Sequence, residues 1–272
     1  MQIRAEIYRL QGDSVKAAEL MRKAFELAPN RSYLGSRAQQ LEAEAVAFKD
    51  YIKTSTAHFD VYFDAQNIFM SRNIDDLLQD LEMAWADITK ALSLYTSQRI
   101  VVLFLLSDDY SGQAPDWSAG LYDGRVRVLV DDYPEKRPQI LSVMKHELSH
   151  ALLHSLDVSL PTWLHEGLAQ LYEPRDVQYA RLSLRGKSLF SLQELNGSWL
   201  GWENNERVYG AYAYSLSFCE FVISQYGTNV FQLLVENCRG KQFEDAWHAT
   251  FGWSLVETNE RHINFIHNLF KG

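Results

Sequence analysis

One segment, residues 139–154, constrains the fold of this chain more than any other feature. Its apolar residues recur every three or four positions, as on the buried face of an amphipathic helix. They are Ile140, Val143, Met144, Leu148 and Leu152. The sequence His146-Glu147-Leu148-Ser149-His150 lies within this period. We therefore predict a helix of about 16 residues that buries its apolar face in a core and turns its histidines towards a cleft.

Two histidines four residues apart on a helix can bind one metal ion. Positions four apart are separated by about 40° around the helix axis, so His146 and His150 project from the same face. Glu147 lies about 100° from His146, which keeps it out of the ligand set but within reach of a water molecule on the metal. The motif therefore predicts two zinc ligands and a separate general base.

A catalytic zinc site needs a third protein ligand, which must come from another segment. Pro161 starts a second predicted helix that ends near Tyr172 and carries His165 and Glu166. Neighbouring residues on a helix point about 100° apart, so we expect only one of the two to face the metal. Of these, we favour Glu166.

The two segments together resemble the gluzincin metallopeptidases, the thermolysin-like class. They are most similar to a bacterial peptidase MA-like family that joins H-E-x-x-H to W-L-x-E-G-x-A, which reads Trp-Leu-His-Glu-Gly-Leu-Ala at residues 163–169. The resemblance covers roughly residues 50 to 272. It implies that His146, His150 and Glu166 bind one Zn²⁺ ion and that Glu147 is the general base and acid.

The resemblance implies zinc-dependent hydrolysis of peptide bonds. Zinc lowers the pKa of its bound water towards about 7, and Glu147 would take the proton and later give it to the departing amine. Related aminopeptidases carry a Gly-x-Met-Glu-Asn segment ahead of the zinc motif, and residues 107–135 contain none. We therefore expect an endopeptidase that acts on a peptide or protein substrate.

Gln170 departs from the thermolysin-like pattern. An acidic residue four positions after the glutamate ligand often orients a histidine ligand there, whereas a neutral amide occupies that position here. We expect a weaker orienting hydrogen bond. A second hypothesis therefore stays open, in which the domain is a catalytically weak or inactive adaptor that binds zinc or protein partners without turnover.

A tyrosine is a candidate donor to the oxyanion of the reaction. Residues 209–218 resemble the Y-A-x-S segment of the family, which makes Tyr212 the candidate. A phenol stays protonated at neutral pH and can donate a hydrogen bond. Tyr209 and Tyr214 are rivals, and packing at the edge of a core is the alternative role of Tyr212.

The first 35 residues predict a helical hairpin. The spacing of Ala5, Tyr8, Ala17, Ala24 and Pro29 resembles one tetratricopeptide repeat, a module that often accompanies the family. One repeat cannot bury its apolar faces alone, so either a following helix, at about residues 37–53, caps it or the chain is cut from a longer array. We favour the longer array, and a protein partner for it. An ordinary hairpin is the alternative.

Residues 56–272 predict the peptidase domain, and residues 36–55 a connecting helix. Alternating or apolar segments at 59–63, 99–106 and 124–130 predict strands, residues 74–94 a helix, and the chain from Val208 onward mostly helices. Strands come first and helices later, which indicates an α+β fold, and the resemblance to gluzincins implies that it is of the zincin-like type. We interpret 124–130 as an edge strand beside a cleft, which either binds substrate backbone or is blunted by Arg125 and Arg127.

Composition excludes several other classes. The net charge of −9 argues against nucleic-acid binding, which depends on Lys and Arg. No apolar stretch approaches the length of a membrane span, and the charged first residues predict no signal peptide, so we expect a soluble chain of unknown compartment. Cys219 and Cys238 are too few for a structural zinc site, and we expect buried thiols.

Overall fold

The structure, a computed structural model, describes residues 1–107, 120–173, 176–197, 199, 202 and 204–271. The chain divides into two compact units, which are described separately. The first unit comprises Met1–Met83 and Ser97–Glu147, and the second comprises Ala84–Thr96 and Leu148–Gly272. Two continuous helices, α4 (Ile68–Leu92) and α6 (Arg137–Ser155), contribute residues to both units. Among the described residues, no helix is both long and apolar enough to span a membrane.

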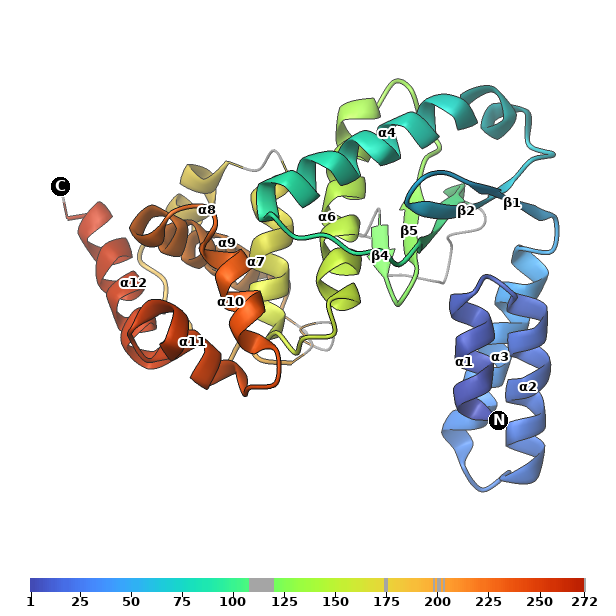
Figure 1. Cartoon of the computed structure of the whole chain (residues 1–272), viewed down its shortest axis with the longest axis horizontal. Helices are drawn as coiled ribbons and strands as arrows, with labels where there is room; N and C mark the ends of the chain where they lie inside the picture. The colour runs from blue at the N-terminus through green and yellow to red at the C-terminus, as the bar shows by residue number, and fades with distance from the viewer. Residues whose placement is uncertain (108–119, 174–175, 198, 200–201, 203, 272) are drawn as a thin grey trace. The chain divides into compact units, whose positions relative to one another are not determined.

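The first unit begins with three helices that lie side by side (Figure 1): α1 (Gln2–Leu10), α2 (Ser14–Leu27) and α3 (Ser32–Ala47). Small alanines allow close approach, and their shared core contains Ala5, Ala17, Ala18, Met21, Leu34, Ala38 and Leu41. The helix α3 therefore packs on the predicted hairpin. The connecting helix predicted over residues 36–55 differs from this: α3 begins earlier, and Tyr51–Ser55 forms strand β1. Antiparallel pairing with the next segment of the chain, Phe59–Asp64, makes residues 51–55 extended.

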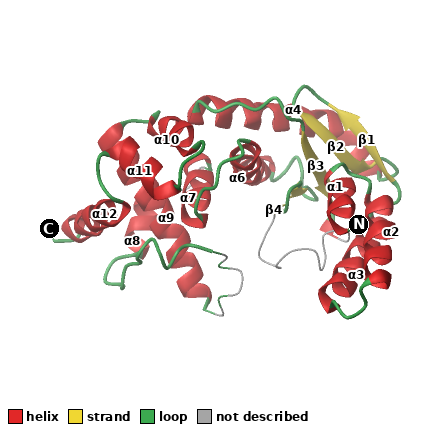
Figure 2. Cartoon of the chain, turned by 60° about the horizontal axis from the view of Figure 1, so that its bottom comes forward, coloured by secondary structure: helices red, strands yellow, loops and turns green. Residues whose placement is uncertain are grey.

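The sheet of the first unit is mixed and has the strand order β1–β2–β3–β5–β4 (Figure 2, strands in yellow). The strands β2 (Phe59–Asp64), β3 (Ile100–Leu105) and β5 (Val126–Leu129) run parallel to one another, while β1 and β4 (Gly120–Tyr122) pair antiparallel at the two ends. This arrangement, with strands before the later helices, is consistent with the predicted α+β class. Helix α4 begins at Ile68, ahead of the predicted start at residue 74.

The prediction that residues 124–130 form an edge strand is wrong. Strand β5 lies between β3 and β4, so β4 is the edge strand among the residues that the structure describes. Arg125 and Arg127 do not blunt an edge either, because both are buried and donate hydrogen bonds to Glu44 of α3. Arginines at alternate positions give the sequence pattern of a half-exposed strand, and the sequence does not show that a distant carboxylate pairs with them in the interior.

The second unit is mostly helical, as the sequence predicts. Its helices are α7 (Thr162–Tyr172), α8 (Val177–Ser183), α9 (Asn205–Tyr226), α10 (Val230–Cys238), α11 (Phe243–Phe251) and α12 (Leu255–Leu269). Trp163 of α7 packs edge-on against Phe218 of α9 and Trp247 of α11, with ring centroids 5.1 and 5.8 Å away. Cys219 and Cys238 are buried free thiols, which confirms that prediction.

Candidate metal centre

Helix α6 carries the H-E-x-x-H motif and is anchored near its start. Arg137 donates to both carboxylate oxygens of Asp80 in α4, at 2.8 and 2.6 Å. Such a two-bond pair fixes direction as well as distance. Farther along, Met144 and Leu148 are fully buried, as the helical period requires. The opposite face of the same turns carries His146 and His150, which keep some exposure to solvent.

Helix α7 is held tightly against α9. A Cβ atom on Gly167 would lie 2.5 Å from the sulfur of Cys219 and 2.6 Å from the carbonyl oxygen of Ser215. Those distances are far below van der Waals contact, so only glycine permits this approach of the two helices. The glycine of the H-E-G segment is thereby explained by packing, because it sets the position from which Glu166 projects.

Gln170 ties the same two helices together. Its side-chain amide donates to the backbone carbonyls of Glu166 and Tyr212, both at 3.0 Å. An ionised carboxylate has no proton to donate, so an acidic residue could not make these two bonds. The departure from the thermolysin-like pattern at this position therefore has a structural reason in this chain.

Three side chains on α6 and α7 converge. One nitrogen each of His146 and His150 and one carboxylate oxygen of Glu166 all lie within 4.8 Å of one another. The Nε2 atom of His150 is 3.6 Å from Oε2 of Glu166. Two imidazoles and one carboxylate are a ligand set that catalytic zinc uses, with a fourth position left for water or substrate. The residues present therefore fit one zinc ion.

His165, the rival third ligand, is not part of this group. Its ring stacks on that of His154, with centroids 4.7 Å apart. Burial, and then the neighbouring His150 and His154, lower the pKa of His165 to about 3, so it is a neutral imidazole at physiological pH. The 100° step between adjacent helix positions thus separates His165 from Glu166, as expected.

Glu147 lies beside the edge strand β4. It is 7% exposed. A Cβ atom on Gly120 would lie 2.8 Å from Cγ of Glu147, 2.9 Å from its Oε1 and 2.6 Å from Cγ1 of Val143. The strand can pass this close only because residue 120 has no side chain. Sequence reasoning missed Gly120, although a glycine inside an extended segment is itself a signal of close approach.

The three candidate tyrosines occupy different environments on α9. The ring of Tyr212 meets the ring of Trp199 edge-on, with centroids 5.2 Å apart. Tyr214 is fully buried, and its hydroxyl donates to Oδ1 of Asn259 at 2.7 Å. Tyr209 is 66% exposed. The hydroxyl of Tyr214 is therefore already committed to a partner in the core.

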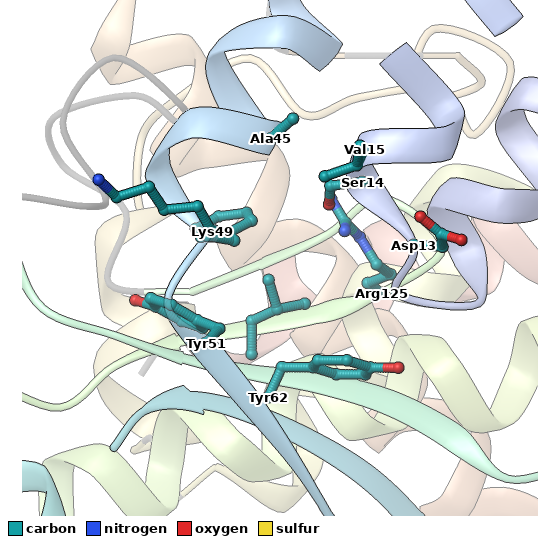
Figure 3. Close-up of a pocket in the computed structure, with 11 residues that line it drawn as sticks. Asp13, Ser14, Val15, Ala45, Lys49, Tyr51, Tyr62 and Arg125 are labelled. Atoms are coloured by element: carbon teal, nitrogen blue, oxygen red, sulfur yellow. The ribbon is translucent and has the colours of Figure 1, made fainter. Parts of the chain in front are cut away.

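A separate cavity lies between the sheet, the start of α2 and the end of α3 (Figure 3). Tyr51 and Tyr62 lie on its sheet side, and Lys49 and the start of α2 lie across from them. The metal-ligand candidates do not line it. Several of its polar groups already have partners, since Tyr62 donates to the carbonyl of Gln11 and Asp13 caps α2. We therefore assign it no part in the metal centre.

The comparison with known families agrees with this geometry. No curated protein matches the chain. Residues 135–268, which contain His146, His150 and Glu166, match the family model of the Peptidase MA superfamily, and this match supports a zincin-like, metallopeptidase-like protein.

Proposed function

We propose that this chain is a zinc-dependent peptidase of the gluzincin type that cuts within peptide chains. The observation that carries the proposal is the convergence of His146, His150 and Glu166, with Glu147 outside that group and next to an edge strand. Ligands and base are thus separate residues, as hydrolysis by an activated water requires. The match to the Peptidase MA superfamily supports the same chemistry.

Each residue has a distinct role in the proposed reaction. Zinc held by His146, His150 and Glu166 would polarise the peptide carbonyl and lower the pKa of water towards about 7. Glu147 takes a proton from the attacking water as the water oxygen bonds to the carbonyl carbon. When the carbon–nitrogen bond breaks, Glu147 returns that proton to the amine, and two peptides leave. Burial beside β4 restricts the movement of the Glu147 carboxylate during both proton transfers.

The edge strand β4 is the proposed site for the substrate backbone. One side of this strand pairs with β5, and it is the last strand of the sheet within the described part of the chain. An extended peptide can add to such an edge through main-chain hydrogen bonds. We therefore propose that residues 120–122 pair with the substrate, in place of residues 124–130, which the sequence suggested for this role. This position brings a bound peptide next to Glu147.

We further propose Tyr212 as the oxyanion donor, and predict that Tyr212→Phe lowers kcat by about 10²–10³-fold. Removing one hydroxyl deletes a hydrogen bond that forms mainly in the transition state, so KM should change little. Tyr209→Phe is the matched control, because Tyr209 is largely exposed on the same helix. Equal kcat values for the two variants would rule out this role and leave Tyr212 as a packing residue.

Hydrolysis of an unbiased peptide library tests the proposed function. We expect the zinc-loaded full chain to cleave internal peptide bonds. A chelator should abolish this cleavage, and added zinc should restore it. Mass spectrometry of the products identifies the bonds cut. Cleavage confined to terminal residues would contradict endopeptidase action. A chain that carries one equivalent of zinc but cleaves nothing would favour the adaptor hypothesis instead.

A further inference from the structure

The turn between β4 and β5 is held by the N-terminal helix α1. Asp123, Gly124 and Arg125 form this turn, and Gly124 has a φ of 91° that favours glycine. Arg9 donates from Nη1 to the backbone carbonyl of Asp123 at 3.1 Å and from Nη2 to its carboxylate. Leu10 covers the next residue, since a Cβ atom on Gly124 would lie 2.4 Å from Cδ2 of Leu10. Two consecutive side chains of α1, Arg9 and Leu10, thus contact two consecutive residues of the turn, Asp123 and Gly124.

A buried cluster of ion pairs holds Arg9 in contact with the turn. Glu44 of α3 accepts hydrogen bonds from Arg9 at 3.3 Å, from Arg127 at 2.7 Å and from Arg125. Burial alone would raise the pKa of Glu44, but the three guanidinium groups hold it at about 2. Arg127 also donates to the carboxylate of Asp123 at 2.9 Å. Removing one partner from such a buried group leaves another charge uncompensated, which is strongly destabilising at that place.

Strand β4 connects this turn to the proposed active site. It has only three residues, which pair as Gly120↔Val128, Leu121↔Arg127 and Tyr122↔Val126. One end leads into the turn held by Arg9, and the other end is Gly120, next to Glu147. Three extended residues span only about 10 Å. If the turn shifts, Gly120 is therefore expected to shift with it, because only Leu121 and Tyr122 lie between Gly120 and the turn.

We infer that helix α1 is a positioning element of the peptidase, in which Arg9 and Leu10 set the place of β4 beside Glu147 and so the register of the bound peptide. This inference rests on the proposed function. It gives helix α1 a part in placing the substrate. Arg9 touches neither substrate nor the reacting atoms and acts through β4.

The test compares Arg9→Gln with Arg22→Gln. Arg22 pairs with Glu42 between α2 and α3, so its loss also removes an arginine–glutamate pair from the helices but leaves the turn intact. We expect Arg9→Gln to lower kcat/KM by about 10–100-fold, with part of the loss in KM, since a misplacement of about 1 Å can cost that much. Zinc occupancy should equal that of the wild type, and Arg22→Gln should stay within about twofold.

Hydrogen exchange supplies a readout that does not depend on catalysis. We expect faster exchange across residues 120–129 in Arg9→Gln and not in Arg22→Gln. Unchanged exchange there, or faster exchange with unchanged kcat/KM, overturns the inference. If Arg9→Gln does not fold, Leu10→Ala is judged by the same criteria, because it keeps the ion cluster and only uncovers Gly124. A wild-type chain that cleaves no peptide overturns the peptidase proposal itself, which separates the two failures.

Discussion

Glu147→Gln is expected to bind one zinc ion as the wild type does and to lose about 10²–10⁴-fold in kcat/KM. Glutamine has nearly the same shape as glutamate, so it fits the narrow space beside Gly120. Its amide cannot accept and return a proton at neutral pH. The ligand group does not include Glu147, so the metal should remain. The measurements are peptide hydrolysis and zinc per chain by elemental analysis.

Glu135→Gln is the control for this substitution. Glu135 is an exposed residue shortly before α6, and the change removes the same charge. We expect its kcat/KM to match the wild type. If Glu147→Gln instead keeps activity within a few-fold of Glu135→Gln, another group carries the proton, and the role proposed for Glu147 is wrong. Zinc loss from Glu147→Gln would point to a ligand role for this residue.

The helices that carry the motif could be predicted because their pattern is local. Residues 139–154 and 161–172 contain the apolar period, and the structure places α6 at Arg137–Ser155 and α7 at Thr162–Tyr172. The step of about 100° per residue also separates Glu166 from His165 without knowledge of the fold. Helical geometry therefore predicted that only one of these two side chains would face the metal, and the family resemblance favoured Glu166.

The substrate edge could not be predicted in the same way. Strand β4 has three residues, too few to show alternation, and the relevant property of Gly120 is the absence of a side chain. Arg125 and Arg127 suggested an exposed edge because their partner, Glu44, lies 81 and 83 residues earlier in the chain. Burial of charge depends on such distant partners. The C-terminal boundary of α3 was missed for a different reason, since antiparallel pairing with the neighbouring strand β2 makes residues 51–55 a strand.

Alanine substitution of each proposed ligand is expected to weaken zinc binding by about 100-fold or more. Zinc in protein sites is bound with roughly 10–16 kcal/mol, so one ligand of three or four contributes about 3 kcal/mol. His146→Ala, His150→Ala and Glu166→Ala should all lose zinc to a chelator at concentrations that leave the wild type loaded, and should cleave no peptide. Competition with a chromophoric chelator measures the affinities, and circular dichroism checks that each variant is folded.

His165→Ala and His154→Ala are the decisive controls for the third ligand. His165 adjoins Glu166 on α7 and stacks on His154, but neither histidine belongs to the converging group. We expect both variants to keep one zinc ion, since the converging ligand group consists of His146, His150 and Glu166 and includes neither ring. Full zinc occupancy in Glu166→Ala together with zinc loss in His165→Ala would transfer the ligand role to His165. Because a histidine in place of the carboxylate changes the site from one anionic ligand to none, such a result would also remove the basis for a gluzincin assignment.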